Sequence, residues 1–108
     1  MNIEKFPPPG IRGLLEIATI DIKIGQNADF EVNIKKAKLV IAQSEGFKSI
    51  EVQKCIEQEN RYLLFIKWET LEDHTVGFRN SELFTQWRAL IGPFFEAPPL
   101  VQHYSTVK

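Results

Sequence analysis

The order in which two hydrophobic periodicities follow one another restricts the fold of this chain more than its composition does. Residues 14–24, LLEIATIDIKI, alternate with the period of two that is typical of a strand. Residues 27–41 instead place apolar side chains three and four positions apart, which predicts a helix with Asn27 as its N-cap. Gly25 interrupts the pattern between them, so a strand leads through a tight turn into a helix.

The same pair of patterns returns after residue 44. Residues 47–57 alternate again, and residues 61–69, RYLLFIKWE, are rich in the aromatic and branched side chains that favour strands. A short polar connection of three residues, Gln58-Glu59-Asn60, lies between these segments. The sequence therefore predicts a β-hairpin in the middle of the chain.

The last third of the chain predicts two helical segments and a final strand. Thr70 opens the tetrapeptide TLED, which has the form of a capping box, and a short helix is expected from there to about Phe78. A second helical segment restarts at residues 80–82 and ends at Gly92-Pro93. Beyond Pro98-Pro99, residues 100–107 are expected to form a short strand.

The predicted order of strand, helix, strand, strand, helix, strand is that of the ferredoxin-like βαββαβ fold, an α+β architecture with a four-stranded antiparallel sheet. Both helices would cover one face of this sheet. The other face still carries apolar side chains, and a soluble monomer rarely exposes so large an apolar surface. We therefore predict a homodimer in which two such faces pack together. Residues 1–13, with three consecutive prolines, are expected to be an extended arm, and residues 14–108 a single domain.

Composition excludes several classes of function. Thirteen basic and fourteen acidic residues give a net charge of -1, which provides no long-range attraction to nucleic acid or to an anionic membrane. No stretch approaches the roughly 20 apolar residues of a membrane-spanning helix, and the N-terminus lacks the apolar core of a signal peptide. The single cysteine, Cys55, cannot form a disulfide within the chain, and a cytosolic location is expected.

Two segments of the chain resemble the antibiotic biosynthesis monooxygenase (ABM) family. One is the strand Leu15-Glu16-Ile17-Ala18. The other runs from Trp68-Glu69-Thr70 through Asp73-His74 and Phe78-Arg79-Asn80-Ser81 to Phe84, Trp87 and Arg88. The resemblance covers about residues 14–104. It implies a dimeric α+β barrel, and family members of known activity oxidise phenols, polycyclic aromatic compounds, quinols or haem, often without flavin or metal. Where the haem-degrading branch has asparagine, tryptophan and histidine, this chain has Ala18, Phe78 and Arg88, which argues against haem degradation.

His74 is the candidate catalytic residue. It lies four positions before Phe78, so both side chains would share one helix face, and a histidine there could accept a proton from a phenol or quinol. The alternative is that His74 caps the helix, bonds to backbone or faces solvent. Arg79 either pairs with a carboxylate or stabilises an oxyanion on the substrate. Ser81 is expected to cap the following helix.

Aromatic residues concentrated in the second half of the chain would supply core and a pocket for a flat apolar ligand. Trp68, Phe78 and Trp87 are the expected pocket walls. Tyr104 either donates a hydrogen bond to substrate or packs in the dimer, and its neighbour His103 would point to the opposite face of the strand. The two histidines do not form a metal motif, and no glycine-rich loop indicates a nucleotide cofactor.

These features predict a cofactor-independent monooxygenase for a small aromatic substrate, in which His74 helps to form the anion that reacts with dioxygen. Two other functions remain open. A non-catalytic module could hold a small hydrophobic ligand in the same cavity, because fold does not determine function. An isomerase or cyclase of polyketide-like substrates would also need a base and an aromatic pocket, but no oxygen.

Overall fold

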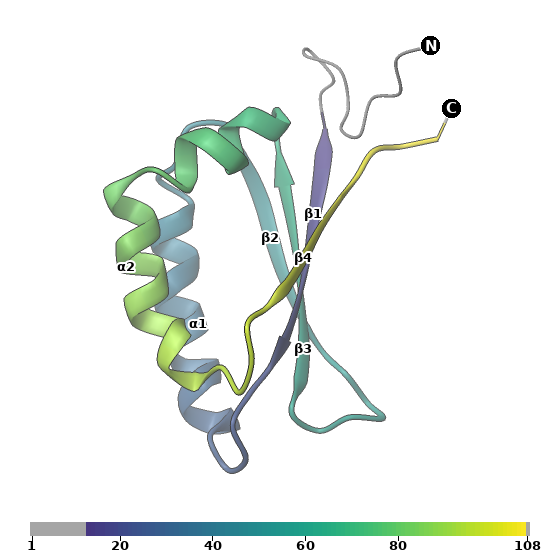
Figure 1. Ribbon diagram of the computed structural model, residues 1–108, viewed down its shortest axis with the longest axis vertical. Helices are drawn as coiled ribbons and strands as arrows, with labels where there is room; N and C mark the ends of the chain where they lie inside the picture. Colours follow the sequence, from purple (N-terminus) through teal and green to yellow (C-terminus); the bar gives the residue numbers. More distant parts are fainter. Residues whose placement is uncertain (1–12, 108) are drawn as a thin grey trace.

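The computed structural model describes residues 13–107, and these form one antiparallel sheet with helices against one of its faces (Figure 1). The strands are β1 (Leu14–Asp21), β2 (Phe47–Lys54), β3 (Arg61–Trp68) and β4 (Leu100–Tyr104), in the order β2-β3-β1-β4. The helices are α1 (Asn27–Ile41) and α2 (Glu82–Ile91), with a π-helical segment η1 (Asp73–Phe78) before α2 and a 3-10 turn η2 (Gly92–Phe94) after it. This is the predicted ferredoxin-like α+β fold, and the predicted central hairpin is β2–β3.

The helix-facing side of the sheet forms the core. Every second residue of β1 and β3 is buried there, and α1 contributes the predicted stripe of Phe30, Ile34, Ala37 and Ile41. Because the side chains of a strand alternate between faces, the remaining residues of β1 and β3 point to the side that no helix covers (Figure 1).

All four strands end earlier than the patterns predicted, β3 by the single residue Glu69, because pairing stops there. Asp21 of β1 lies opposite Arg61, the first residue of β3, so the β1–β3 ladder stops there. Ile22 forms only an isolated bridge with Phe95, and Ile24 is 91% exposed. β2 likewise ends at Lys54 instead of residue 57, and β4 at Tyr104 instead of residue 107. Tyr104 pairs with Leu15, next to the start of β1, so the sheet offers no further partner to β4.

The cap predicted for α1 was wrong. Gln26 occupies the N-cap position without a side-chain hydrogen bond, and Asn27 is the first helical residue. The Asn27 side chain donates instead to the Glu59 carbonyl and to the Tyr62 hydroxyl, both at 3.0 Å. Tertiary contacts with the β2–β3 hairpin therefore determine the role of this asparagine.

The capping box before η1 is confirmed. The Thr70 hydroxyl accepts from the Asp73 backbone N–H, while the Asp73 carboxylate accepts from the Thr70 backbone N–H. The same carboxylate lies directly against Gly46, which has a φ of +81° and no room for a Cβ atom. This contact joins the start of β2 to the segment that carries His74.

The helical segment after the capping box is wider than the predicted α-helix. The Arg79 backbone N–H donates to the His74 carbonyl, five residues earlier, as in a π-helix. His74 and Phe78 nevertheless share its buried face, as predicted, with exposed fractions of 4% and 2%.

The structure bears only in part on the expected membrane topology, location and N-terminal arm. No helix within residues 13–107 is long and apolar enough to cross a membrane. The expected cytosolic location stays a prediction. The expected N-terminal arm lies outside the described residues, apart from Gly13.

Candidate functional site

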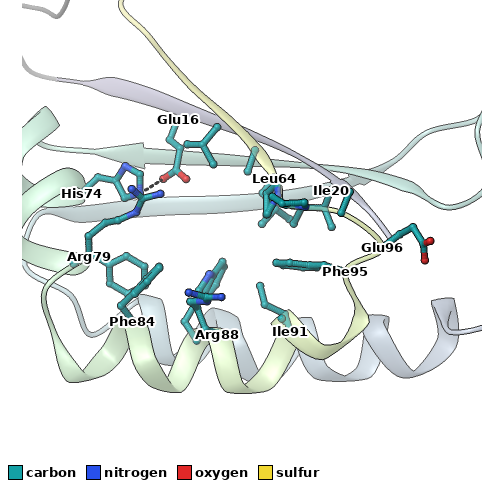
Figure 2. A pocket seen from close by; sticks show the side chains of 18 residues that line it. Glu16, Ile20, Leu64, His74, Arg79, Phe84, Arg88, Ile91, Phe95 and Glu96 are labelled. Carbon is teal, nitrogen blue, oxygen red and sulfur yellow. Dashed lines mark ion pairs between the residues drawn. The ribbon is translucent and has the colours of Figure 1, made fainter. Parts of the chain in front are cut away.

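A cavity of about 550 Å³ lies between the sheet and helix α2 (Figure 2). β1, β3, η1, α2 and the chain between η2 and β4 all contribute to it. Its wall is mostly apolar, and this part of the wall consists of Ala18, Ile20, Leu64, Phe78, Phe84, Trp87, Ile91, Phe95 and Val101. Size and lining match those of sites for small, largely apolar molecules.

A buried carboxyl and a buried imidazole close one end of the cavity. Glu16 of β1 is 5% exposed and His74 of η1 is 4% exposed, and both line the cavity. The Trp68 indole N–H donates to Oε1 of Glu16 at 2.8 Å, and Nε2 of His74 lies 3.4 Å from the same oxygen. The Trp68 ring also stacks on the His74 ring, with the centroids 5.4 Å apart. Trp68 therefore fixes both members of the pair.

A second histidine continues this arrangement toward the surface. Nδ1 of His74 lies 2.8 Å from Nε2 of His103, so one of these two nitrogens carries a hydrogen and the other accepts it. His103 lies directly opposite Glu16 in the β1–β4 ladder and is half-buried. Glu16, His74 and His103, which we call the acid–imidazole chain, are thus linked from cavity to surface.

Burial favours the uncharged form of all three groups, so the two imidazoles are neutral near neutral pH while Glu16 titrates in that range. Burial raises the pKa of Glu16 to about 7, although the Trp68 hydrogen bond and the positive charge of Arg79 oppose the rise. Burial, followed by the charges of His103 and Arg79, lowers the pKa of His74 to about 3. Burial and Arg79 also lower the pKa of His103. Although its geometry is that of an ion pair, the contact between His74 and Glu16 therefore involves a neutral imidazole.

Two arginines provide positive charge at the cavity. Arg79 follows η1, and its side chain reaches toward Glu16 and His74 (Figure 2). Arg88 of α2 also lines the cavity, and the guanidinium groups of both arginines lie over the Phe84 ring, at 5.7 and 5.9 Å from its centroid. No carboxylate of residues 13–107 lies within ion-pair distance of Arg79, so the carboxylate pairing considered for it from sequence does not occur there.

Four of the six site residues predicted from sequence line the cavity: His74, Phe78, Arg79 and Trp87. Trp68 does not line it, because it is fully buried behind Glu16 and His74. Tyr104 belongs to the opposite face of the sheet, where it is 45% exposed and its hydroxyl donates to Gln102. Within one chain Tyr104 therefore cannot reach a ligand in the cavity.

Sequence reasoning did not single out Glu16 and gave His103 no role in the site. One signal for Glu16 was present, because it shares the parity of Leu14, Ala18 and Ile20, which made it the only charged residue among the buried positions of β1. His103 was recognised as pointing away from Tyr104, but its approach to His74 depends on the pairing of β4 with β1. Within residues 13–107, no group of three His, Cys, Asp or Glu side chains is arranged to hold a metal ion.

Known proteins share both the sequence pattern and the fold. An uncharacterised Bacillus subtilis (strain 168) protein, YczJ, is 39% identical over 92 residues, which cover 85% of this chain and 97% of YczJ. The crystal structure of a Bordetella bronchiseptica protein, assigned provisionally as an antibiotic biosynthesis monooxygenase, has a TM-score of 0.87 and 36% identity, with 91% of this chain and 100% of that chain covered.

A Caulobacter crescentus CB15 structure with the same provisional assignment has a TM-score of 0.75 at 16% identity, with 90% of this chain and 92% of that chain covered. At that identity it supports the fold alone.

The family model of antibiotic biosynthesis monooxygenases matches residues 14–90, which is more than half of the sequence. The chain therefore belongs to the antibiotic biosynthesis monooxygenase family.

Proposed function

We propose that this protein is a cofactor-independent monooxygenase that oxidises a small phenol or quinol with dioxygen inside the cavity. One observation carries the proposal: an apolar cavity, with aromatic side chains in its wall, ends in a buried carboxyl and imidazole, Glu16 and His74. The apolar wall would hold a flat ring and exclude water, while the acid–imidazole chain would exchange a proton with the ring hydroxyl.

Deprotonation makes the substrate itself the electron donor. A phenolate passes electrons to dioxygen more readily than a phenol, so the protein needs only to form, position and stabilise the anion. One oxygen atom then enters the ring and the other leaves as water, and the ring supplies all four electrons, so a phenol becomes a quinone without an external reductant. Arg79, whose charge already acts on Glu16, would stabilise the phenolate.

A non-catalytic module for a small hydrophobic ligand is the second candidate. Both ring nitrogens of His74 already have partners within the chain, as is usual for a histidine with a structural role. Such a module would bind the same ligands without consuming oxygen. An isomerase or cyclase would convert its substrate at the same rate with and without oxygen.

Oxygen uptake by the purified protein with a panel of quinols tests the proposal. A matched pair of variants controls for uncatalysed oxidation by air. Ala97→Trp would fill the cavity from its exposed rim, whereas Ala89→Trp adds the same side chain to an exposed site on α2 away from the cavity. We expect uptake with at least one quinol, a large loss in A97W and none in A89W. The proposal would be refuted by equal rates of oxygen uptake in both variants, or by uptake no faster than that of the quinol in buffer without protein.

We also propose that the protein is a homodimer, joined through the sheet face that the helices leave open. Apolar side chains on β1, β3 and β4 share this face, namely Leu15, Ile17, Leu63, Phe65, Leu100 and Tyr104. Leu100 is 59% exposed in the single chain, and a twofold axis would bury the whole surface against its copy. The role of Tyr104 would then be dimer packing.

The dimer is tested by sedimentation of a charge variant in the middle of this face. Phe65→Glu would place two carboxylates in the interface, and we expect it to sediment as a folded monomer. Val32→Glu, at a 55% exposed position of α1, is the matched control and should sediment like the unaltered protein. An unaltered protein that sediments as a monomer at high concentration would exclude this assembly.

A further inference from the structure

We propose that Glu16, rather than His74, takes the proton from the substrate, and that His74 and His103 are positioning residues that hold its carboxyl. This inference rests on the proposed function, because it names the acceptor in the proton transfer of that reaction. It replaces the base expected from sequence by a residue of β1 that no sequence motif indicated.

The first argument is that His74 has no free nitrogen to offer. Its Nδ1 is 2.8 Å from His103 and its Nε2 is 3.4 Å from Oε1 of Glu16. A general base needs an unshared electron pair within hydrogen-bond reach of the proton it accepts. One neutral imidazole has only one such pair, and both ring positions already face groups of the chain.

The second argument is that Glu16 has a free oxygen at the cavity. Oε1 accepts the Trp68 indole N–H, whereas Oε2 has no hydrogen-bond partner among residues 13–107. No side-chain nitrogen or oxygen in that part of the chain is both fully buried and unpartnered, so Oε2 must reach open space. Glu16 lines the cavity, and Figure 2 shows its carboxyl directed into it.

The third argument comes from the groups around this carboxyl. Its titratable and charged neighbours are His74 on η1, His103 on β4 and Arg79 after η1, and both imidazoles remain neutral. Burial raises the pKa of Glu16 to about 7, which matches a base that must alternate between its two states near neutral pH. The pKa of His74, lowered to about 3, makes that imidazole a poor proton acceptor.

The chemical step is a single proton transfer. The O–H bond of the substrate breaks, its electron pair stays on the substrate oxygen, and an O–H bond forms at Oε2 of Glu16. In the tautomer that we propose, His74 Nδ1 accepts from the His103 Nε2–H, and the His74 Nε2–H therefore faces Oε1 of the carboxylate at 3.4 Å. His103 thus selects the His74 tautomer that supports the charged carboxylate.

Two variants of Glu16 test its role as the base, with oxygen uptake as the measured rate. Glu16→Gln keeps the size of the side chain and an oxygen that can accept from Trp68, but it cannot take a proton. We expect kcat to fall at least about 100-fold with a much smaller change in KM. Glu16→Asp, which keeps the acid, should recover part of the activity. A rate in E16Q equal to that of the unaltered protein would overturn the inference and leave the proposed function intact.

The pH profile distinguishes positioning from a merely structural role. In the unaltered protein, kcat should rise with pH through about 7, as Glu16 becomes a carboxylate, and E16Q should lack this limb. His103→Gln should move the midpoint of the kcat profile to higher pH, because His74 is then no longer held in the tautomer that directs its Nε2–H at the carboxylate. An unmoved midpoint in H103Q would overturn the positioning role.

A measurement without turnover separates this inference from the proposed function. Under nitrogen, 4-nitrophenol is added to the protein slightly above neutral pH, while visible absorbance follows the phenolate and infrared difference spectra follow the carbonyl band of a protonated carboxyl. We expect the phenolate and the carbonyl band to appear together, and both to be lost in E16Q. If this occurs without oxygen uptake from any quinol, the proposed function fails and the assignment of Glu16 stands. A bound phenolate without the carbonyl band, or no binding of the phenol, would overturn the assignment.

Discussion

Replacing Glu16 by glutamine should stabilise the fold at high pH, although it removes the residue assigned to catalysis. Glu16 is 5% exposed, and its pKa rises from the ordinary value of 4.5 to about 7 because burial disfavours the carboxylate. Between these values the folded protein holds a proton that the unfolded chain has released. Folding stability from this group is therefore fully present below about pH 4.5 and is lost as the pH rises through about 7.

The size of the effect follows from the two pKa values. At about 1.4 kcal/mol per pH unit, the interval from 4.5 to about 7 corresponds to about 3 kcal/mol. His74 contributes with the opposite sign, because its lowered pKa makes stability rise with pH between about 3 and 6.5. Both proteins contain His74, so its contribution cancels when their stabilities are subtracted. Glutamine keeps the hydrogen bond from Trp68, so the difference reports the buried charge.

Urea unfolding of both proteins at a series of pH values and one fixed protein concentration measures this difference. The stability of E16Q relative to the unaltered protein should increase by about 2 to 3 kcal/mol between about pH 5 and pH 8. Glu45→Gln, which removes an exposed carboxylate, is the control and should show almost no change with pH. A difference for E16Q that stays constant across this range would refute the argument that burial controls the Glu16 carboxyl.

Two further substitutions test the contacts that hold η1 and the start of α2, the elements that carry the helical side of the cavity. Gly46→Ala combines a φ of +81° with overlap of the Asp73 carboxylate and should lower the free energy of unfolding by about 2 to 3 kcal/mol. Gly25→Ala, at φ +80° with open space around it, is the control and should lower it by only about 1 to 2 kcal/mol. Equal losses in urea unfolding would exclude the overlap as a cause. Ser81→Ala removes the side-chain acceptor for the Phe84 N–H at the start of α2 and should lower the free energy of unfolding by about 1 kcal/mol, while Ser81→Asp, which keeps an acceptor, should restore it.

The fold was largely predictable because periodicity and local chemistry agree along the chain. The alternation in β1 and β3 and the spacing of apolar residues in α1 each fit one secondary structure, and Ser81 caps α2 as predicted. The strand ends were not predictable, since they depend on where a partner strand stops. The role of Asn27 was missed because its side chain bonds to Tyr62, 35 residues away. Local capping preference could not reveal this contact.

The residues of the candidate site that could be predicted come from the helical part of the chain, namely His74 and Phe78 of η1, Arg79 after it and Trp87 of α2. His74 and Phe78 share a face of η1, and this followed from their spacing in sequence. Glu16 and His103 reach His74 through the pairing of β1 with β4, which no sequence spacing encodes. Glu16 could have been noticed as a charged residue on the buried parity of its strand. The direction of Oε2 and the contacts of both His74 nitrogens depend on how the folded strands and η1 meet, which the sequence does not encode locally.

The cavity is assembled from β1, β3, η1 and α2, which come together only when the whole sheet is formed. An unfolded or half-folded chain therefore has no binding site, and any compound that occupies the cavity shifts the folding equilibrium. A ligand present at a hundred times its Kd would add about 2.7 kcal/mol to the free energy of unfolding, enough to raise the melting temperature by several degrees. A melting screen against libraries of phenols and quinols can thus test the proposed class of ligand before any reaction is known.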